Sequence, residues 1–254
     1  MDISQWMTWY EKILEDFGFS RYYDEESAEL LNRLLNVQGS LALNEIPVKE
    51  KAIILGAGPS LKRNIVELKS LVLDDFLIIA ADGATTALLE EDVVPDVVVT
   101  DLDGEMESIF KANQAGAVMV VHAHGDNSIK IKKHVHELRR VIGTTQSTPL
   151  EHVYNFGGFT DGDRAVFLAV ELGVKVIVMA GMDFGKVTTR YSRPELGSEI
   201  AEADQIKQLK LEYAKELVEW VAENEEVLVW NISGGESLRG VEDILLEEFE
   251  DYIP

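Results

Sequence analysis

The sequence predicts an α/β protein: an open, doubly wound, mostly parallel sheet with helices on both faces, preceded by a small helical N-terminal region. Short, continuously apolar runs recur from Lys51 onward, as in strands that are buried on both faces of a parallel sheet. Helical stretches lie between these runs, and such alternation of strand and helix is typical of this fold class. Before Lys51 the apolar residues follow a helical period instead.

Residues 1–46 form the expected helical N-terminal region. Its first helix carries one apolar stripe, made by Ile3, Trp6, Tyr10, Ile13 and Phe17. A second helical run follows over Glu25–Leu35, and Pro47 then interrupts the pattern. We therefore assign residues 47–254 to an α/β nucleotide-binding catalytic domain. The N-terminal aromatic residues Trp6, Trp9 and Tyr10 form either a candidate homodimer surface or a cap on the sheet.

The predicted strands and helices alternate along the rest of the chain. Six apolar runs are expected to be strands: Ala52–Leu55, Phe76–Ala81, Val97–Val99, Ala117–Val121, Val176–Ala180 and Val227–Trp230. Between them we expect helices over Leu61–Leu71, Thr85–Glu91, Glu105–Gln114, Ser128–Arg139, Asp161–Leu172 and Ala201–Asn224. The acidic tail, residues 236–254, is expected to end the chain as a helix with a solvated face.

Composition excludes several classes of function. The chain has 46 Asp and Glu against 23 Lys and Arg, a formal net charge of −23, which argues against a general binder of the nucleic-acid backbone. With no Cys, zinc sites and iron–sulfur clusters with Cys ligands are excluded. No run approaches the roughly 18 apolar residues that span a bilayer. We expect a cytoplasmic protein with neither a nucleic-acid nor a membrane partner.

Ligands of open α/β sheets bind beyond the carboxyl ends of the strands, so the residues after each apolar run are the candidate site. The first run is followed by a glycine turn, Gly56 to Ser60, which opens a helix. Gly56 and Gly58 allow close approach of a ligand, and the helix N-terminus favours a phosphate. The alternative is a tight turn in which Ser60 caps the helix.

Acidic residues follow the next two runs. Asp82 stands where nucleotide-binding sheets often hold a ribose hydroxyl, although it could also cap the following helix. Asp101 and Asp103 are two residues apart on an extended segment, so their side chains point the same way. Paired carboxylates of this kind suit Mg²⁺, which takes oxygen ligands together with substrate phosphates. A capped turn with solvated charges is the alternative.

Two histidines and an acid follow the fourth run. His122 and His124 beside Asp126 could hold zinc, as in a metal-dependent hydrolase. We prefer the interpretation in which Asp126 joins Asp101 and Asp103 around Mg²⁺, since the three would lie on adjacent strand ends.

Two further segments carry candidate binding residues. A glycine-rich stretch before the helix at Asp161 offers aromatic and polar groups for a flat heteroaromatic substrate, and Asp161 itself is either part of this site or the helix cap. Lys207 and Lys210 share a helix face and either meet phosphates or are solvated. The loop containing Arg190, Tyr191 and Arg193 is a lid or an exposed connection.

Four motifs in order resemble the archaeal 6-hydroxymethyl-7,8-dihydropterin pyrophosphokinase family. They are Gly56-Ala57-Gly58-Pro59-Ser60-Leu61, Ala81-Asp82-Gly83-Ala84, Pro95-Asp96-Val97-Val98-Val99-Thr100-Asp101-Leu102-Asp103-Gly104 and His122-Ala123-His124-Gly125-Asp126-Asn127. The middle motifs are also similar to thiamin pyrophosphokinase. The opening motif departs from that enzyme and is shared with flagellin-modification proteins and some sialyltransferases.

The resemblance implies transfer of diphosphate from ATP to the hydroxymethyl group of 6-hydroxymethyl-7,8-dihydropterin, with release of AMP. It implies Asp101, Asp103 and Asp126 as catalytic magnesium ligands. The glycine turn, Asp82 and the two lysines would then bind the nucleotide. From position and residue type alone, we expect Asn155, Phe156 and Asp163 to bind the pterin.

Three other functions stay open from the sequence. The first is a thiamin pyrophosphokinase. The second is a nucleotide-sugar glycosyltransferase of the sialyltransferase-like type, which would bind a cytidine nucleotide and consume no ATP. The third is a nucleotide-binding module without catalysis, whose affinity would survive loss of Asp101 and Asp103.

Overall fold

The computed structural model describes residues 1–69 and 73–245, and nine strands within these ranges form one sheet whose neighbouring strands are all parallel. In spatial order the strands are β11 (Glu242–Asp243), β10 (Leu228–Asn231), β7 (Val176–Ala180), β1 (Lys51–Leu55), β2 (Phe76–Ala81), β3 (Val97–Thr100), β4 (Val118–Ala123), β5 (Val141–Thr145) and β6 (Val153–Tyr154). The chain runs from β1 outward to β6 and then returns to β7 on the other side of β1. The predicted doubly wound α/β fold is confirmed.

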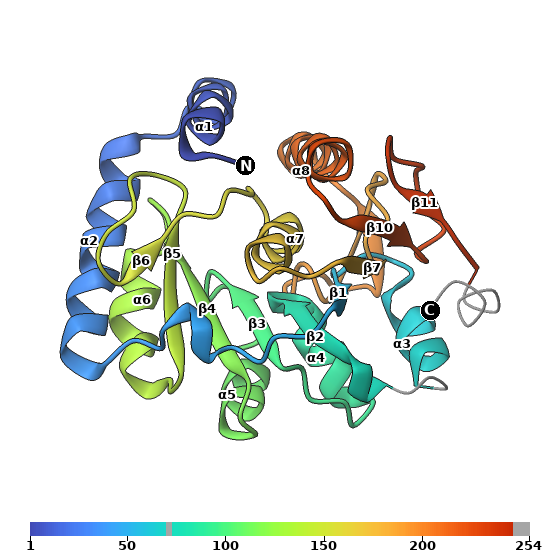
Figure 1. The fold of residues 1–254 in the computed structure, drawn as a ribbon, viewed down its shortest axis with the longest axis horizontal. Coiled ribbons are helices and arrows are strands. Elements are labelled where there is room, and N and C mark those ends of the chain that lie inside the picture. The colour runs from blue at the N-terminus through green and yellow to red at the C-terminus, as the bar shows by residue number, and fades with distance from the viewer. Residues whose placement is uncertain (70–72, 246–254) are drawn as a thin grey trace.

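Helices cover both faces of this sheet (Figure 1). One face carries α1 (Ile3–Phe17), α7 (Asp161–Glu171) and α8 (Gln205–Asn224). The other carries α3 (Leu61–Leu68), α4 (Asp82–Glu90), α5 (Met106–Gln114) and α6 (Ser128–His134), with α2 (Arg21–Gln38) packed beside α6 at the β5–β6 edge. Short 3-10 turns lie at Leu43–Glu45, Leu73–Asp75 and Val135–Glu137.

The alternation of side chains along each strand separates the two cores. In β4, Val118 and Val120 pack toward α1, α7 and α8, whereas Met119 and Val121 pack toward α2, α5 and α6. Both sets are buried, which is why the strands read as continuous apolar runs in the sequence.

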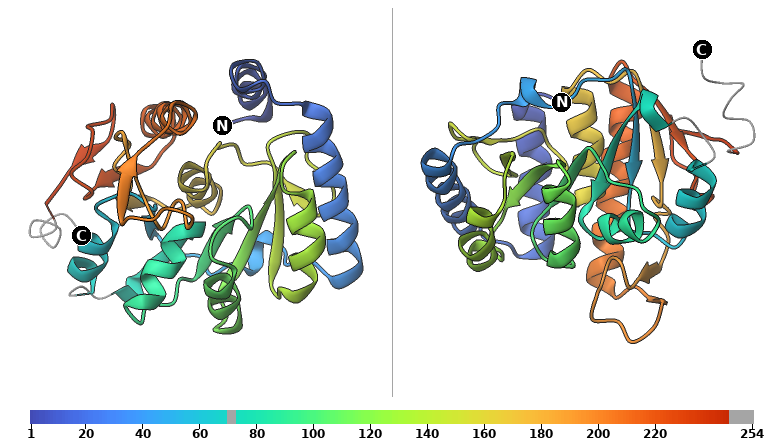
Figure 2. Two further views of the ribbon diagram at one scale, coloured as in Figure 1. Left: turned by 180° about the vertical axis from the view of Figure 1, so that it is seen from behind. Right: turned by 90° about the horizontal axis from the view of Figure 1, so that it is seen from below.

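A two-stranded antiparallel arm stands apart from the main sheet. Its strands are β8 (Val187–Thr189) and β9 (Ile200–Glu202), between β7 and α8. The arm projects from the molecule in the right-hand view of Figure 2. Tyr191 ties it to α4, since its hydroxyl donates a 2.6 Å hydrogen bond to Glu90.

The N-terminal helices pack onto the chain's own core. Helix α1 begins with a capping box at Asp2 and ends at Gly18, whose left-handed backbone (φ 66°) suits glycine. Trp6 and Tyr10 are 1% and 0% exposed, and the Trp6 indole donates to the Gln146 carbonyl at 2.7 Å. These two aromatics therefore cap the sheet, which is one of the two alternatives given above, and a homodimer stays a prediction.

Several predicted elements differ in detail from the structure. Strands β5 and β6 were not expected from the sequence. The helix expected over Ala201–Asn224 begins only at Gln205, because strand β9 precedes it. Of the expected tail helix, residues 236–245 contain strand β11 instead, and residues 246–254 lie outside the described part of the chain. In the described ranges, no helix is long and apolar enough to span a bilayer.

Candidate active site

A cavity of about 390 Å³ lies at the carboxyl ends of the strands. Its wall runs from the glycine turn after β1, through the acids after β2 and β3, to the residues that follow β4 and β5. The opposite wall is formed by the start of α7, the loop after β7, the arm and α8. The cavity is thus in the position that the sheet predicts.

Three carboxylates converge at the centre of this cavity, and we call Asp82, Asp101 and Asp103 the acid group. One oxygen from each lies within 4.8 Å of the others. Thr100 holds the arrangement: its hydroxyl donates to Asp82 and accepts the Leu102 amide at 2.8 Å. The positive φ of Leu102 (65°) makes the turn that brings both acids of this segment to one side.

The lack of a side chain at Gly104 allows the three carboxylates to come together. A Cβ at this position would lie 1.8 Å from Asp82 Oδ1, so any other residue would push that carboxylate away. Asp82 Oδ1 is buried and has no hydrogen-bond partner among the described residues. An orphan carboxylate oxygen facing two further carboxylates is a donor set that fits a divalent cation such as Mg²⁺.

The three acids of this group differ in pKa. Burial and then the charge of Asp101 raise the pKa of Asp82 to about 7 and that of Asp103 to about 6. Burial acts on Asp101 in the same direction, but hydrogen bonds from His124 and Asp103 outweigh it and hold the pKa of Asp101 well below 3.8. A bound cation would relieve this repulsion.

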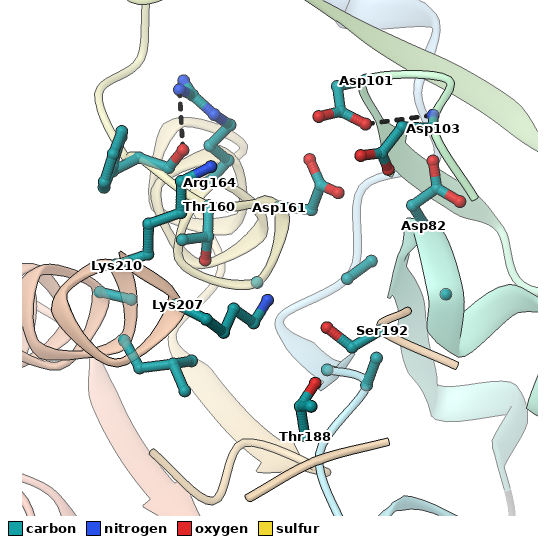
Figure 3. A pocket seen from close by; sticks show the side chains of 18 of the residues that line it. Asp82, Asp101, Asp103, Thr160, Asp161, Arg164, Thr188, Ser192, Lys207 and Lys210 are labelled. Atoms are coloured by element: carbon teal, nitrogen blue, oxygen red, sulfur yellow. Dashed lines mark hydrogen bonds between the residues drawn. The ribbon is translucent and has the colours of Figure 1, made fainter. Parts of the chain in front are cut away.

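Asp161 faces the acid group from the first turn of α7 (Figure 3). Burial, followed by the charge of Asp101, raises its pKa well above 3.8. The helix cap is made by its neighbours instead, since Thr160 is the N-cap and Asp163 completes the capping box. Asp161 is thereby left free to point into the cavity.

Asp126 lies outside the acid group. It lines the cavity but is exposed, and its backbone amide donates to His124 at 3.4 Å. Asp82 occupies the third position that we expected Asp126 to take. The Asp82 side chain does not cap α4, which removes that alternative.

The two histidines have separate partners. His124 Nε2 lies 3.2 Å from Asp101, and His122 Nδ1 lies 3.2 Å from the Thr144 hydroxyl. Within residues 1–69 and 73–245, the acid group contains neither histidine, so the geometry does not favour zinc.

The glycine turn packs against a second loop. The amides of Gly56 and Gly58 donate to the carbonyls of Ala180 and Gly181 at 2.9 and 2.8 Å. The Ser60 amide and hydroxyl donate to Asp183 Oδ2 at 3.3 and 2.9 Å. A side-chain carboxylate therefore stands at the start of α3, where we expected a phosphate, and the turn meets the cavity with its backbone surface.

Lys207 and Lys210 lie across the cavity from the acid group (Figure 3). Burial, and then the charge of Lys210, lowers the pKa of Lys207. Lys210 lies 5.9 Å from the centre of the Phe159 ring. In the described part of the chain neither lysine forms an ion pair, so both charges are available to an anionic ligand.

Three residues expected to bind the pterin do not line the cavity. Asn155 donates to the Ser147 carbonyl at 2.6 Å, and Phe156 stacks on Tyr154 with ring centres 5.4 Å apart. Asp163 is fully buried and accepts from the Phe159 and Thr160 amides at 2.5 and 2.8 Å. In the structure all three therefore contact other parts of the chain and not the cavity.

A buried polar group lies at the other end of the cavity, and of its members only His122 was a candidate from the sequence, as a zinc ligand. Asp24, His122, Gln146 and Arg164 line this end and are each at least nine-tenths buried. Arg164 follows Asp163 in the glycine-rich segment and lies on the buried face of α7. A charged residue at such a position could have been recognised from the sequence as a candidate binding residue. Asp24 and Gln146 are 122 residues apart and carried no such signal.

A family model described as 6-hydroxymethylpterin diphosphokinase MptE-like matches residues 26–189. The 6-hydroxymethyl-7,8-dihydropterin pyrophosphokinase of Methanothermobacter thermautotrophicus is 53% identical over 90% of the chain and 99% of its own length. The enzyme of that name in Methanocaldococcus jannaschii is 46% identical over 89% of the chain and 98% of its own length.

Among solved structures, the MAf glycosyltransferase from Magnetospirillum magneticum AMB-1 matches with a TM-score of 0.56 and 14% identity. The match covers 82% of this chain and 35% of that one. At this identity the likeness shows a shared fold alone.

We predict that Mg²⁺ stabilises the protein more at pH 8 than at pH 5.5. At pH 5.5 Asp82 and Asp103, with pKa values of about 7 and about 6, hold protons that the ion must displace. Without the ion, these raised pKa values make folding less favourable as pH rises from 3.8 to about 7. At a hundredfold excess over Kd the ion should add about 2.7 kcal/mol, or roughly 5–10 °C in Tm.

Thermal unfolding at both pH values measures this effect, with Asp82→Asn as the matched variant. If Mg²⁺ raised Tm equally at both pH values, or raised it in Asp82→Asn as much as in the unchanged protein, the acid group would not be the metal site.

Asp163→Ala should lower stability by about 3 kcal/mol, roughly 6–12 °C in Tm, since it removes the acceptor of buried backbone amides. Asp161→Asn is the matched control: it removes a repelled charge that caps nothing, so Tm should stay the same or rise. Thermal unfolding of the two variants compares them. An unchanged Tm in Asp163→Ala together with a raised KM for pterin would instead make Asp163 a substrate contact.

Proposed function

The chain belongs to the family of MptE-like 6-hydroxymethylpterin diphosphokinases, and we propose how its cavity carries out the reaction of that family. The activity is pyrophosphokinase activity on 6-hydroxymethyl-7,8-dihydropterin, a step of pterin biosynthesis. In our proposal the diphosphoryl group comes from ATP, and AMP is released. The observation that carries this mechanism is the acid group in the cavity lining. Lys207 and Lys210 lie across from it, and neither forms an ion pair with any described residue.

Asp82, Asp101 and Asp103 would hold Mg²⁺ in this proposal, so Asp82 takes the place that we first gave to Asp126. When bound, the ion supplies positive charge to the phosphate oxygens. Thr100 and Gly104 keep the three carboxylates converged whether or not substrate is present. Such preorganisation means that the site need not rearrange as charge develops.

The nucleotide would lie over the glycine turn and the loop after β7. These two loops meet between β1 and β7, where the order of the strands in the sheet reverses, which is the usual ligand position in an open α/β sheet. From there the phosphates extend toward the acid group. Lys207 and Lys210 then face the bridging oxygen between the α- and β-phosphates, where negative charge builds as AMP leaves.

The acceptor alcohol would approach from the opposite end of the cavity. Its oxygen attacks the β-phosphorus, and the bond from that phosphorus to the α,β-bridging oxygen breaks. Asp161 faces this point from α7 and accepts the hydroxyl proton. Burial makes its carboxylate a better proton acceptor than an exposed Asp.

The other functions left open by the sequence receive less support. The relatives that cover nearly the whole chain carry the pterin activity in their names. The glycosyltransferase likeness concerns the fold alone.

The direct test incubates the protein with ATP, Mg²⁺ and 6-hydroxymethyl-7,8-dihydropterin and identifies the nucleotide product by chromatography. We expect AMP in equal amount to pterin diphosphate. Asp101→Asn and Asp103→Asn should each lower kcat by about 10²–10³-fold, the usual effect of removing one preorganised electrostatic contact.

Asp126→Asn serves as the matched control, because it changes a carboxylate on the cavity wall outside the acid group. It should keep kcat within a few-fold of the unchanged protein. ADP as product, faster turnover of thiamin, or a loss in Asp126→Asn as large as in Asp101→Asn would contradict the proposal.

A further inference from the structure

A buried polar network closes the end of the cavity beside α2. Asp24 accepts hydrogen bonds from the Tyr10 hydroxyl at 2.6 Å, from Gln146 Nε2 at 2.8 Å and from the Gly125 amide at 2.7 Å. Gln146 Oε1 in turn accepts from Arg164 Nη2 at 3.1 Å. Each bond fixes the next, so the guanidinium of Arg164 is held in one orientation.

Arg164 is a buried cation without a carboxylate in contact. It is 6% exposed and lines the cavity, and none of the ion pairs among the described residues includes it. Its Nη2 donates to Gln146 and to the Phe159 carbonyl at 3.0 Å. A guanidinium has five N–H donors, so others are left for a ligand that accepts hydrogen bonds.

His122 supplies a hydrogen-bond acceptor, whereas Arg164 supplies donors. The Thr144 hydroxyl donates to the Val121 carbonyl at 3.3 Å, so the Thr144 oxygen acts as the acceptor for the Nδ1–H of His122. Burial, and then the charge of Arg164, lowers the pKa of His122 well below 6.5, so the ring is neutral. Nε2 is therefore a bare acceptor, and it has no partner in the described ranges.

We propose that His122 and Arg164 recognise the amide edge of the pterin, with His122 Nε2 accepting from a ring N–H and Arg164 donating to the adjacent 4-oxo oxygen. The assignment rests on the proposed function and names the residues that select its acceptor. An unpaired acceptor and unpaired donors match this edge, which places an N–H beside a carbonyl. Both side chains line the same end of the cavity.

The distance to the reacting atoms is suitable. His122 is the last residue but one of β4 and Gln146 follows β5, whereas Asp101 follows β3. Neighbouring strands are about 4.8 Å apart, so this end lies roughly 5–10 Å from the acid group. A two-ring heterocycle spans such a distance, with its hydroxymethyl group directed at the acid group.

The N-terminal helices then have a role in specificity. Tyr10 on α1 and Asp24 on α2 orient Gln146, and through it Arg164. Tyr10 acts as a positioning residue, since it is not among the residues that line the cavity, whereas Asp24 lines the cavity and also orients Arg164 through Gln146. The nucleotide end of the cavity is built by the α/β part of the chain.

The test compares His122→Asn with His122→Gln. Asn places its amide where Nδ1 was and can keep the Thr144 contact, but it removes the acceptor at the Nε2 position. Gln restores an acceptor there. We expect His122→Asn to raise KM for pterin about 10–100-fold, as when a buried partner is lost, and His122→Gln to recover most of it. KM for ATP should stay within a few-fold in both.

His136→Asn, an exposed histidine outside the cavity, is the control and should leave both KM values unchanged. A pterin KM in His122→Asn equal to that of the unchanged protein would overturn the inference, as would an equal rise in the KM values for pterin and ATP.

A second measurement needs no variant at this position. In the 2,4-diamino analogue of the substrate, an amino group replaces the 4-oxo oxygen, and the adjacent ring nitrogen loses its hydrogen. The unchanged protein should bind this analogue at least about 10²-fold more weakly than the pterin, measured by calorimetry. Equal affinity would overturn the inference. Failure of the proposed function would look different, since the unchanged protein would then form no pterin diphosphate at all.

Discussion

The arrangement of the cavity depends on one constraint: carboxylates that repel one another are held together at the carboxyl ends of the strands of a buried sheet. Asp82, Asp101 and Asp103 meet there because the parallel strands β2 and β3 end side by side. Their pKa values diverge because three negative charges this close together, one of them buried, repel one another without a counter-charge. A Thr hydroxyl, a left-handed turn and a glycine maintain this unfavourable arrangement, which the proposed cation would make favourable.

The order of strands in the sheet arranges the rest of the cavity around that point. On one side, the loops after β1 and β7 pack on each other and line the end of the cavity that we assign to the nucleotide. On the other side, β4 and β5 carry the polar residues that we assign to the acceptor. Lysines on α8 face the centre from the opposite wall. In this proposal the nucleotide and the acceptor lie one after the other along the carboxyl ends of the strands, and the diphosphoryl group passes between them at the acid group.

Much of the fold was predictable, because continuous apolar runs report burial on both faces, whereas β5 was missed since Gly143 and its threonines break that pattern. The family was predictable from ordered motifs. Residue roles were less so. Asp82 and Asp126 both follow strands, and only the turn geometry decides which of them converges with Asp101. Asp161 and Asp163 share one helix end, and hydrogen bonds that the sequence does not reveal make Asp163, which we expected at the pterin, the residue of the capping box.

The central claim is that Asp82, Asp101 and Asp103 together bind the divalent cation. The most direct measurement is a crystal structure with Mn²⁺ and a non-hydrolysable ATP analogue, in which anomalous scattering locates the ion. The account predicts a peak within about 2.0–2.4 Å of an oxygen from each of the three carboxylates, the range for metals with oxygen ligands. A peak bound through Asp126 without Asp82, or no peak at the acid group, would contradict it.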